Sequence, residues 1–156
     1  MKEYPALIGM LAGSAGGAVA IGLMEAFSTR AAIPLMAIPF ATSIVLVMGS
    51  PAVDAAQPRA LIGGHIVATI IGLIVLRIAG PEPWAAALAV GLSIAGMHLT
   101  RTFHPPAGID PLLVVVNNLP WSFLIVPVAL GAALLALFAF IWHLLIRRYS
   151  WPARWW

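Results

Sequence analysis

The stretch "TRTFHPPAGIDPLL", residues 100–113, divides this chain. It places an arginine, a histidine, two adjacent prolines and an aspartate between apolar segments. Proline is favoured in the first turn of a helix, whereas the residue before a proline disfavours helical geometry. We therefore expect one helix to end near Phe103 and a short helix to begin at Pro105.

The composition around this stretch is that of a membrane protein. Of the 156 residues, 62% are hydrophobic and 8% are charged, whereas soluble domains are about a quarter charged. The net charge of +3 comes from basic residues that stand mostly alone at segment ends, which favours a topology signal over nucleic-acid binding. The chain has no cysteine, which excludes a thiolate metal site or nucleophile. We expect an all-α membrane protein without cofactors.

Apolar runs long enough to cross a bilayer, about 20 residues, predict four long transmembrane helices. The first exceeds the roughly 7–15 residues of a signal-peptide core, so we expect it to be retained. Within it, Gly9, Gly13 and Gly17 recur at every fourth position, which predicts close helix packing within or between subunits. The four runs are 6–27, 61–79, 84–103 and 121–146.

Two further apolar stretches, 31–49 and 105–117, are interrupted by prolines and predict short proline-led helices. A shift of 71 residues superposes Thr29-Arg30-x-x-x-Pro34 on Thr100-Arg101-x-x-x-Pro105. We therefore predict one transmembrane domain, 1–156, made of tandem repeat halves at about 6–79 and 84–148. Interrupted helices inside repeats are typical of transporters, and the interruptions mark the substrate site.

The short helices allow two topologies. If they are re-entrant or half helices, the chain crosses four times; if they cross, it crosses six times and the repeats are inverted. The length of 105–117 favours four crossings, which we prefer slightly, and the positive-inside rule favours six. Both place the termini in the cytoplasm of a bacterial inner membrane. With six crossings, the terminal side carries Lys2, Arg59, Arg101, Arg147, Arg148 and Arg154, against Arg30 and Arg77.

Polar residues near the interruptions predict a site for a small anion. A helix that begins inside a membrane presents free N–H groups and the positive end of its dipole. Arg101 and His104 flank one such start, and Gln57 and Arg59 stand at the head of the span that contains His65. The expected substrate-binding residues are Gln57, Arg59, His65, Arg101, His104, Pro105, Pro106, Gly108 and Asp110.

Each of these residues also has a structural interpretation. The arginines can be interfacial, and Asp110 can pair with one of them. His65 faces the same side as Thr69 and Gly72, where a neighbouring group can satisfy it. We expect His143 to be interfacial. His98 and His104 lack the spacing of a helical zinc site, so no metal is expected.

The segments "LTRTFHPPAG" (99–108) and "AQPRALIGGH" (56–65) resemble the signatures of the HPP family of small membrane proteins. The resemblance implies four membrane-spanning helices. Some plant chloroplast and cyanobacterial members are implicated in nitrite transport, which makes nitrite the implied substrate. Ile109-Asp110-Pro111 departs from the small residues and threonine usual after the motif. An acid at this position indicates proton coupling or a different substrate.

These patterns favour a channel or transporter for a small inorganic anion, with nitrite as the expected substrate. The expected partners are the lipid bilayer, the anion and further copies in a homo-oligomer, without nucleic acid. The alternatives are a scaffold or regulatory subunit that transports nothing and a membrane metalloenzyme. No nucleophile motif or paired-carboxylate spacing supports an enzyme.

Overall fold

The computed structural model describes residues 6–32 and 37–155, and Lys2 and Pro34 lie outside them. Within these residues the secondary structure is entirely helical, which confirms the all-α prediction. Three helices are long and apolar enough to cross a membrane: Leu7–Ala31, Pro58–Ala79 and Leu124–Arg147. The elements are α1 (Ala6–Ala31), η1 (Ile38–Phe40), α2 (Ala41–Gly49), η2 (Asp54–Ala56), α3 (Pro58–Ala79), α4 (Pro83–Leu99), η3 (Pro105–Gly108), α5 (Ile109–Val116), η4 (Leu124–Ala129), α6 (Leu130–Trp142) and η5 (His143–Arg147).

The expected fourth long helix, 84–103, is shorter in the structure. Its counterpart α4 has 17 residues and ends at Leu99. Arg101 adopts left-handed geometry with φ 57°, its N–H donates to His98 O, and Thr102 N–H donates to Met97 O. This pair of bonds closes a helix in a Schellman motif, which usually has glycine at the left-handed position. The helix therefore ends at this capping motif, before the chain reaches Pro105 and Pro106.

Both short helices begin with a 3-10 turn that contains proline. Pro39 lies in η1 before α2, and Pro105 and Pro106 open η3 before α5, as predicted. The two 3-10 turns contact each other near the middle of the molecule. A long helix, a short proline-led helix and another helix thus follow in that order in each half, while the tandem repeat stays a prediction.

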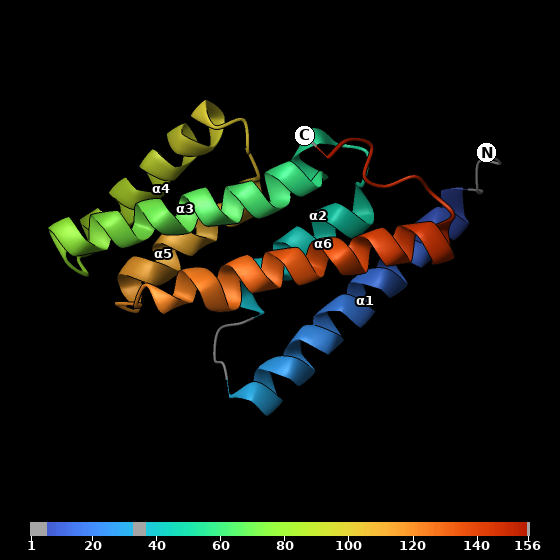
Figure 1. Ribbon diagram of the computed structural model, residues 1–156, viewed down its shortest axis with the longest axis horizontal. Helices are drawn as coiled ribbons and strands as arrows, with labels where there is room; N and C mark the ends of the chain where they lie inside the picture. The colour runs from blue at the N-terminus through green and yellow to red at the C-terminus, as the bar shows by residue number, and fades with distance from the viewer. Residues whose placement is uncertain (1–5, 33–36, 156) are drawn as a thin grey trace.

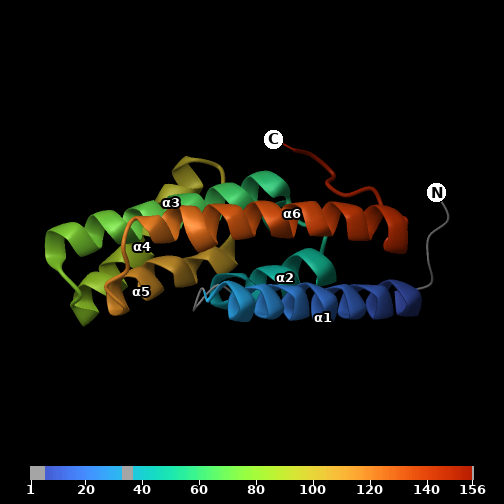
Figure 2. The ribbon, with the colours of Figure 1, turned by 60° about the horizontal axis from the view of Figure 1, so that its bottom comes forward.

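Successive helices reverse direction throughout the chain. Figures 1 and 2 show α1, α3 and α5 running one way and α2, α4 and α6 running the other. In particular, α5 begins near the end of α4 and ends near the start of η4. The chain therefore does not turn back to the side where α5 begins, as a re-entrant helix would. These directions match the arrangement with six alternating segments.

The central helix is α3, which packs against α4, α5 and α6. The long α1 packs against α2 and the end of α6 and diverges from the other helices (Figure 1). A Cβ on Gly13 would lie 2.7 Å from Met48 O, so the glycine face of α1 is used against α2 within one chain. Large apolar side chains on the rest of α1 are exposed, as expected for a lipid-facing helix.

His143 was expected at the membrane interface, and the structure buries its side chain inside the protein. Its ring is 0% exposed and contacts Val47 O at 3.1 Å. The segment after α6 folds back over it, so that Tyr149 and Trp151 pack against the imidazole. The interior extends to the end of α6 because of this returning segment.

The backbone of α3 lies very close to the segment before η3. A Cβ on Gly64 would lie 2.6 Å from His104 Cβ and 2.8 Å from Thr102 O. We expect Gly64→Ala to destabilise the protein by about 1–3 kcal/mol, because the backbone cannot move away without disturbing the core. Thermal unfolding in detergent would measure the change. Gly91→Ala in α4 is the control, because a Cβ there meets nothing within 4 Å. Equal unfolding temperatures for the two variants would contradict the close approach.

Candidate functional site

Four segments bring polar side chains together in the apolar interior. Ser43 comes from α2, His65 and Thr69 from α3, His104 from the residue before η3, and Asp110 from α5. All five residues are 0% exposed. Buried polar groups destabilise a fold unless they are hydrogen-bonded, so this cluster has to be satisfied from within.

The cluster forms one continuous chain of hydrogen bonds. Asp110 Oδ2 lies 2.7 Å from His65 Nδ1 and accepts a second bond from Thr69 Oγ1 at 3.1 Å. Ser43 Oγ lies 2.9 Å from His65 Nε2 and 2.8 Å from His104 Nε2. His104 Nδ1 then lies 2.6 Å from Ala55 O. The chain thus runs from α5 to the loop between α2 and α3.

The hydrogen bonds determine where the protons lie. A carbonyl only accepts, so His104 Nδ1 carries a hydrogen, and a neutral His104 then accepts at Nε2 from the Ser43 hydroxyl. Ser43 has a single hydrogen, so it cannot also donate to His65 Nε2. His65 Nε2 must therefore donate to Ser43.

With this donor assignment, His65, His104 and Asp110 together carry one more proton than two neutral imidazoles and a carboxylate would. Either His65 is an imidazolium beside a carboxylate, or Asp110 is a carboxylic acid that donates to His65 Nδ1. Both forms have no net charge, which suits an apolar interior. Asp110 Oδ1 has no partner within the described part of the chain. The carboxyl group is thus the open end of the hydrogen-bond chain.

The helix sequence places these side chains. His65, Thr69 and Gly72 lie on one face of α3, as the sequence predicted, and all three are buried. Gly72 leaves room for α5, because a Cβ there would lie 2.7 Å from Pro111 Cα. Asp110 in the first turn of α5 is thereby brought against His65 and Thr69. It pairs with a histidine, and the alternative of pairing with an arginine is wrong.

The helix start at which the anion site was expected offers few free amides. Pro105 and Pro106 have no N–H, and Ala107 N–H donates to His104 O at 3.0 Å. Pro105 is exposed, Pro106 and Gly108 are partly buried, and the side chain of His104 faces inward to Ser43. The HPP segment, His104-Pro105-Pro106, therefore holds the buried network together. It offers few backbone donors to a ligand.

Gln57 lines the pocket beside the α2–α3 loop, and its side-chain amide has partners within the protein. Its amide nitrogen donates to Pro51 O at 2.9 Å and to Val53 O at 3.0 Å. Its carbonyl oxygen accepts from Ala153 N at 2.9 Å. Both amide hydrogens are used inside the protein, so Gln57 fixes the α2–α3 loop and the returning C-terminal segment.

The predicted arginines meet in a small pocket beside this loop. Arg59 is partly buried and donates from Nη2 to Thr100 O at 3.0 Å, which ties the start of α3 to the end of α4. Arg101 is exposed, and Arg154, which forms an ion pair with Asp54, completes the basic lining. The pocket has a volume of about 330 Å³ and is lined by Asp54, Gln57, Arg59, Ala60, Arg101, Arg154 and Trp155.

Sequence reasoning missed two contributors. Ser43 is a lone serine in an apolar stretch, and only the fold places it between two histidines. Arg154 was assigned to topology, but the returning segment brings it to Asp54. Across residues 6–32 and 37–155, no group of three His, Cys, Asp or Glu side chains is placed to hold a metal ion.

Comparison with known proteins identifies a family and relatives of this chain. Residues 2–152 match a family model described as "HPP, transmembrane region". Two Dictyostelium discoideum proteins, each named only as a transmembrane protein, are 40% and 37% identical over 126 residues. The matches cover 75% of this chain but 40% and 44% of those proteins, so the chain spans less than half of their length. No solved structure matches the chain.

The central position of Ser43 gives a test of the network. We expect Ser43→Ala to lower the free energy of unfolding by about 1–3 kcal/mol, because both imidazole Nε2 atoms lose their partner in a buried site. Thr42→Ala is the matched control, since Thr42 is the exposed neighbour in the same turn. Thermal unfolding in detergent compares the two variants. A loss no larger than that of Thr42→Ala would show that the serine bridge contributes nothing.

Proposed function

The chain belongs to the family described as the HPP transmembrane region, and we propose that it transports a small inorganic anion across a membrane together with a proton. It acts as a transporter and not as an enzyme. Three apolar helices of spanning length support its place in a lipid bilayer. The buried hydrogen-bond chain and the basic pocket beside it support the two transported species.

The basic pocket would receive the anion. Three arginines and one aspartate line it, which gives a net positive charge even with the ion pair between Arg154 and Asp54 formed. Arg59 uses one N–H for Thr100 O, and a guanidinium has five such donors. The backbone of Arg101 is left-handed and its side chain is exposed, so its charge is available to a ligand. A volume of about 330 Å³ accommodates a small anion with its water.

The buried network would carry the proton. Asp110 and His65 share one proton in a cluster that is neutral when its hydrogen bonds are complete. Ser43 connects this pair to His104, and a hydroxyl between two imidazoles can pass a proton by accepting on one side and donating on the other. Histidine has the side chain best suited to exchanging protons near neutral pH.

The contact between His104 and Ala55 O carries the proposal, because it joins the two parts. His104 Nδ1 donates to this carbonyl at 2.6 Å. Asp54 and Gln57, which flank Ala55 and Ala56 in the same loop, line the basic pocket. A movement of this loop on anion binding would therefore change the hydrogen bond at the end of the network. An anion and a proton that cross together transfer no net charge, which lowers the electrostatic cost of crossing.

Nitrite is the substrate that we propose, on the basis of the family resemblance and of the small basic pocket. We propose a bacterial inner membrane, with both termini and Arg59, Arg101, Arg147, Arg148 and Arg154 on the cytoplasmic side, in line with the positive-inside rule. The short helices would then cross with the long ones in six segments, within a homo-oligomer.

The transport proposal predicts nitrite uptake into proteoliposomes that is faster when the outside is more acidic than the lumen. Empty vesicles under the same gradient are the necessary control, because protonated nitrite crosses lipid unaided. Arg59→Gln and Arg101→Gln should each raise the nitrite concentration needed for half-maximal uptake, since each removes positive charge from the pocket. Uptake by folded protein at the rate of empty vesicles would refute the proposal.

Asp110→Asn separates proton coupling from anion transport. An asparagine amide can donate one hydrogen to His65 Nδ1 and the other to Thr69 Oγ1, which replaces both contacts of Asp110 Oδ2 without a titratable proton. We expect the variant to fold, to exchange nitrite for nitrite, and to gain nothing from a pH gradient.

The matched control is Thr69→Val, which removes one hydrogen bond to the same carboxyl group but no titratable group. It should keep the response to the gradient. If Asp110→Asn kept the same response as the wild type, the proton would have to travel by another route.

A further inference from the structure

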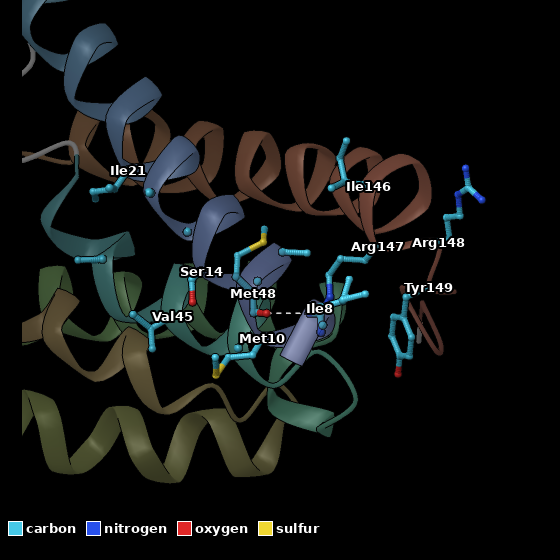
Figure 3. A pocket seen from close by; sticks show the side chains of 17 residues that line it. Ile8, Met10, Ser14, Ile21, Val45, Met48, Ile146, Arg147, Arg148 and Tyr149 are labelled. Atoms are coloured by element: carbon cyan, nitrogen blue, oxygen red, sulfur yellow. Dashed lines mark hydrogen bonds between the residues drawn. The ribbon is translucent and has the colours of Figure 1, made fainter. Parts of the chain in front are cut away.

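A second, larger cavity lies on the opposite side of α2 from the buried network, between α1, α2 and the end of α6. Its volume is about 1230 Å³, above the roughly 300–1,000 Å³ typical of small-molecule pockets. Figure 3 shows apolar side chains along most of its length and Arg147, Arg148 and Tyr149 at one end. The cavity thus has a long apolar part and a cationic end.

Small residues of α1 create the apolar part. Gly9, Gly13 and Gly17 line it together with Val45 and Met48 of α2. The backbones touch at Gly13, where a Cβ would meet Met48 O at 2.7 Å, while a Cβ on Gly17 would meet its nearest neighbour only at 3.8 Å. The two helices therefore touch at one level and leave space beside it. Val45 is 71% exposed within this space.

The two arginines at the cationic end have no acidic partner among the residues that the structure describes. Arg147 is partly buried, and its Nη1 donates to Met48 O at 2.8 Å, in the last turn of α2 (Figure 3). Neither Arg147 nor Arg148 forms an ion pair with any residue that the structure describes. None of the described residues that line the cavity is acidic. Most guanidinium donors at this end remain open to an anion.

We infer that this cavity binds an anionic phospholipid, with the phosphate on Arg147 and Arg148 and an acyl chain along the groove between α1 and α2. Guanidinium groups match phosphate oxygens in bidentate geometry, and Tyr149 adds a hydroxyl at the same end. Basic pockets between transmembrane helices are typical sites for anionic lipid headgroups. The cavity is also lined by two helices of membrane-spanning length, so a lipid reaches it from the bilayer.

Charge complementarity favours a lipid over a second copy of the chain. A partner copy would need a free carboxylate at the level of Arg147 and Arg148. Asp54 is paired with Arg154, and Asp110 is buried inside the network. Glu25 and Glu82 lie near the opposite ends of α1 and α3 from this cationic end. Among the described acidic residues, none is thus placed to neutralise the arginines, whereas a phosphate is.

The test compares phosphatidylglycerol with phosphatidylcholine of identical acyl chains, each added to detergent-purified protein. We expect phosphatidylglycerol to raise the unfolding temperature more, and native mass spectrometry to retain it selectively. The double variant Arg147→Gln/Arg148→Gln should weaken this binding at least about tenfold, because charge-assisted hydrogen bonds contribute about 1.5–3 kcal/mol. Arg77→Gln, at the exposed end of α3, is the control that removes charge elsewhere.

Two further arms separate the possible occupants. Val45→Trp should weaken lipid binding by filling the groove, whereas Val45→Ala should not. Glycerol phosphate alone should bind far more weakly than the whole lipid if the acyl chain contributes. Equal binding of both lipids would overturn the inference. A dimer whose stability does not change with added lipid but decreases in Val45→Trp would also overturn it. Lipid binding is independent of nitrite flux, so its failure leaves the transport proposal intact.

Discussion

Ser43 has one hydroxyl hydrogen for two imidazole nitrogens, and this shortage constrains the whole interior. The hydroxyl lies within 2.9 Å of both rings, so one ring must donate and the other must accept. His104 is committed by its bond to Ala55 O, which leaves His65 as the donor to Ser43. With His104 neutral, the hydrogen-bond geometry therefore requires one proton on the pair of Asp110 and His65. The same geometry holds α2, α3, the HPP segment and α5 together.

The glycines and prolines of the chain make this network possible. Gly64 lets the HPP segment approach α3, and Gly72 lets α5 approach the same helix. Pro105 and Pro106 start the short helix without adding N–H groups that would need partners in the interior. Because Gly64, His65 and the HPP segment come from the two motifs of the chain, both motifs serve the same buried cluster.

Local sequence patterns predicted the membrane class, the proline-led start of α5 and the polar face of α3 that carries His65, Thr69 and Gly72. They could not predict which residues would meet, because Ser43 and Asp110 lie far from their partners along the chain. The end of α4 was placed too late, since left-handed geometry at Arg101 has no signal such as glycine. Gln57 was predicted to bind the ligand, because its partners become neighbours only in the folded chain. These partners are the carbonyl groups of Pro51 and Val53 and the N–H group of Ala153.

The divergence of α1 from the other helices makes Ser43 sensitive to motion. Since α1 and α2 pack on each other, a tilt of this pair would carry Ser43 with it. Its hydrogen bonds of 2.8 and 2.9 Å would both be lost after a displacement of roughly 1 Å, because hydrogen bonds weaken steeply beyond about 3.2 Å. The proton route proposed above would then be interrupted abruptly and not gradually, because both hydrogen bonds end within the same short displacement.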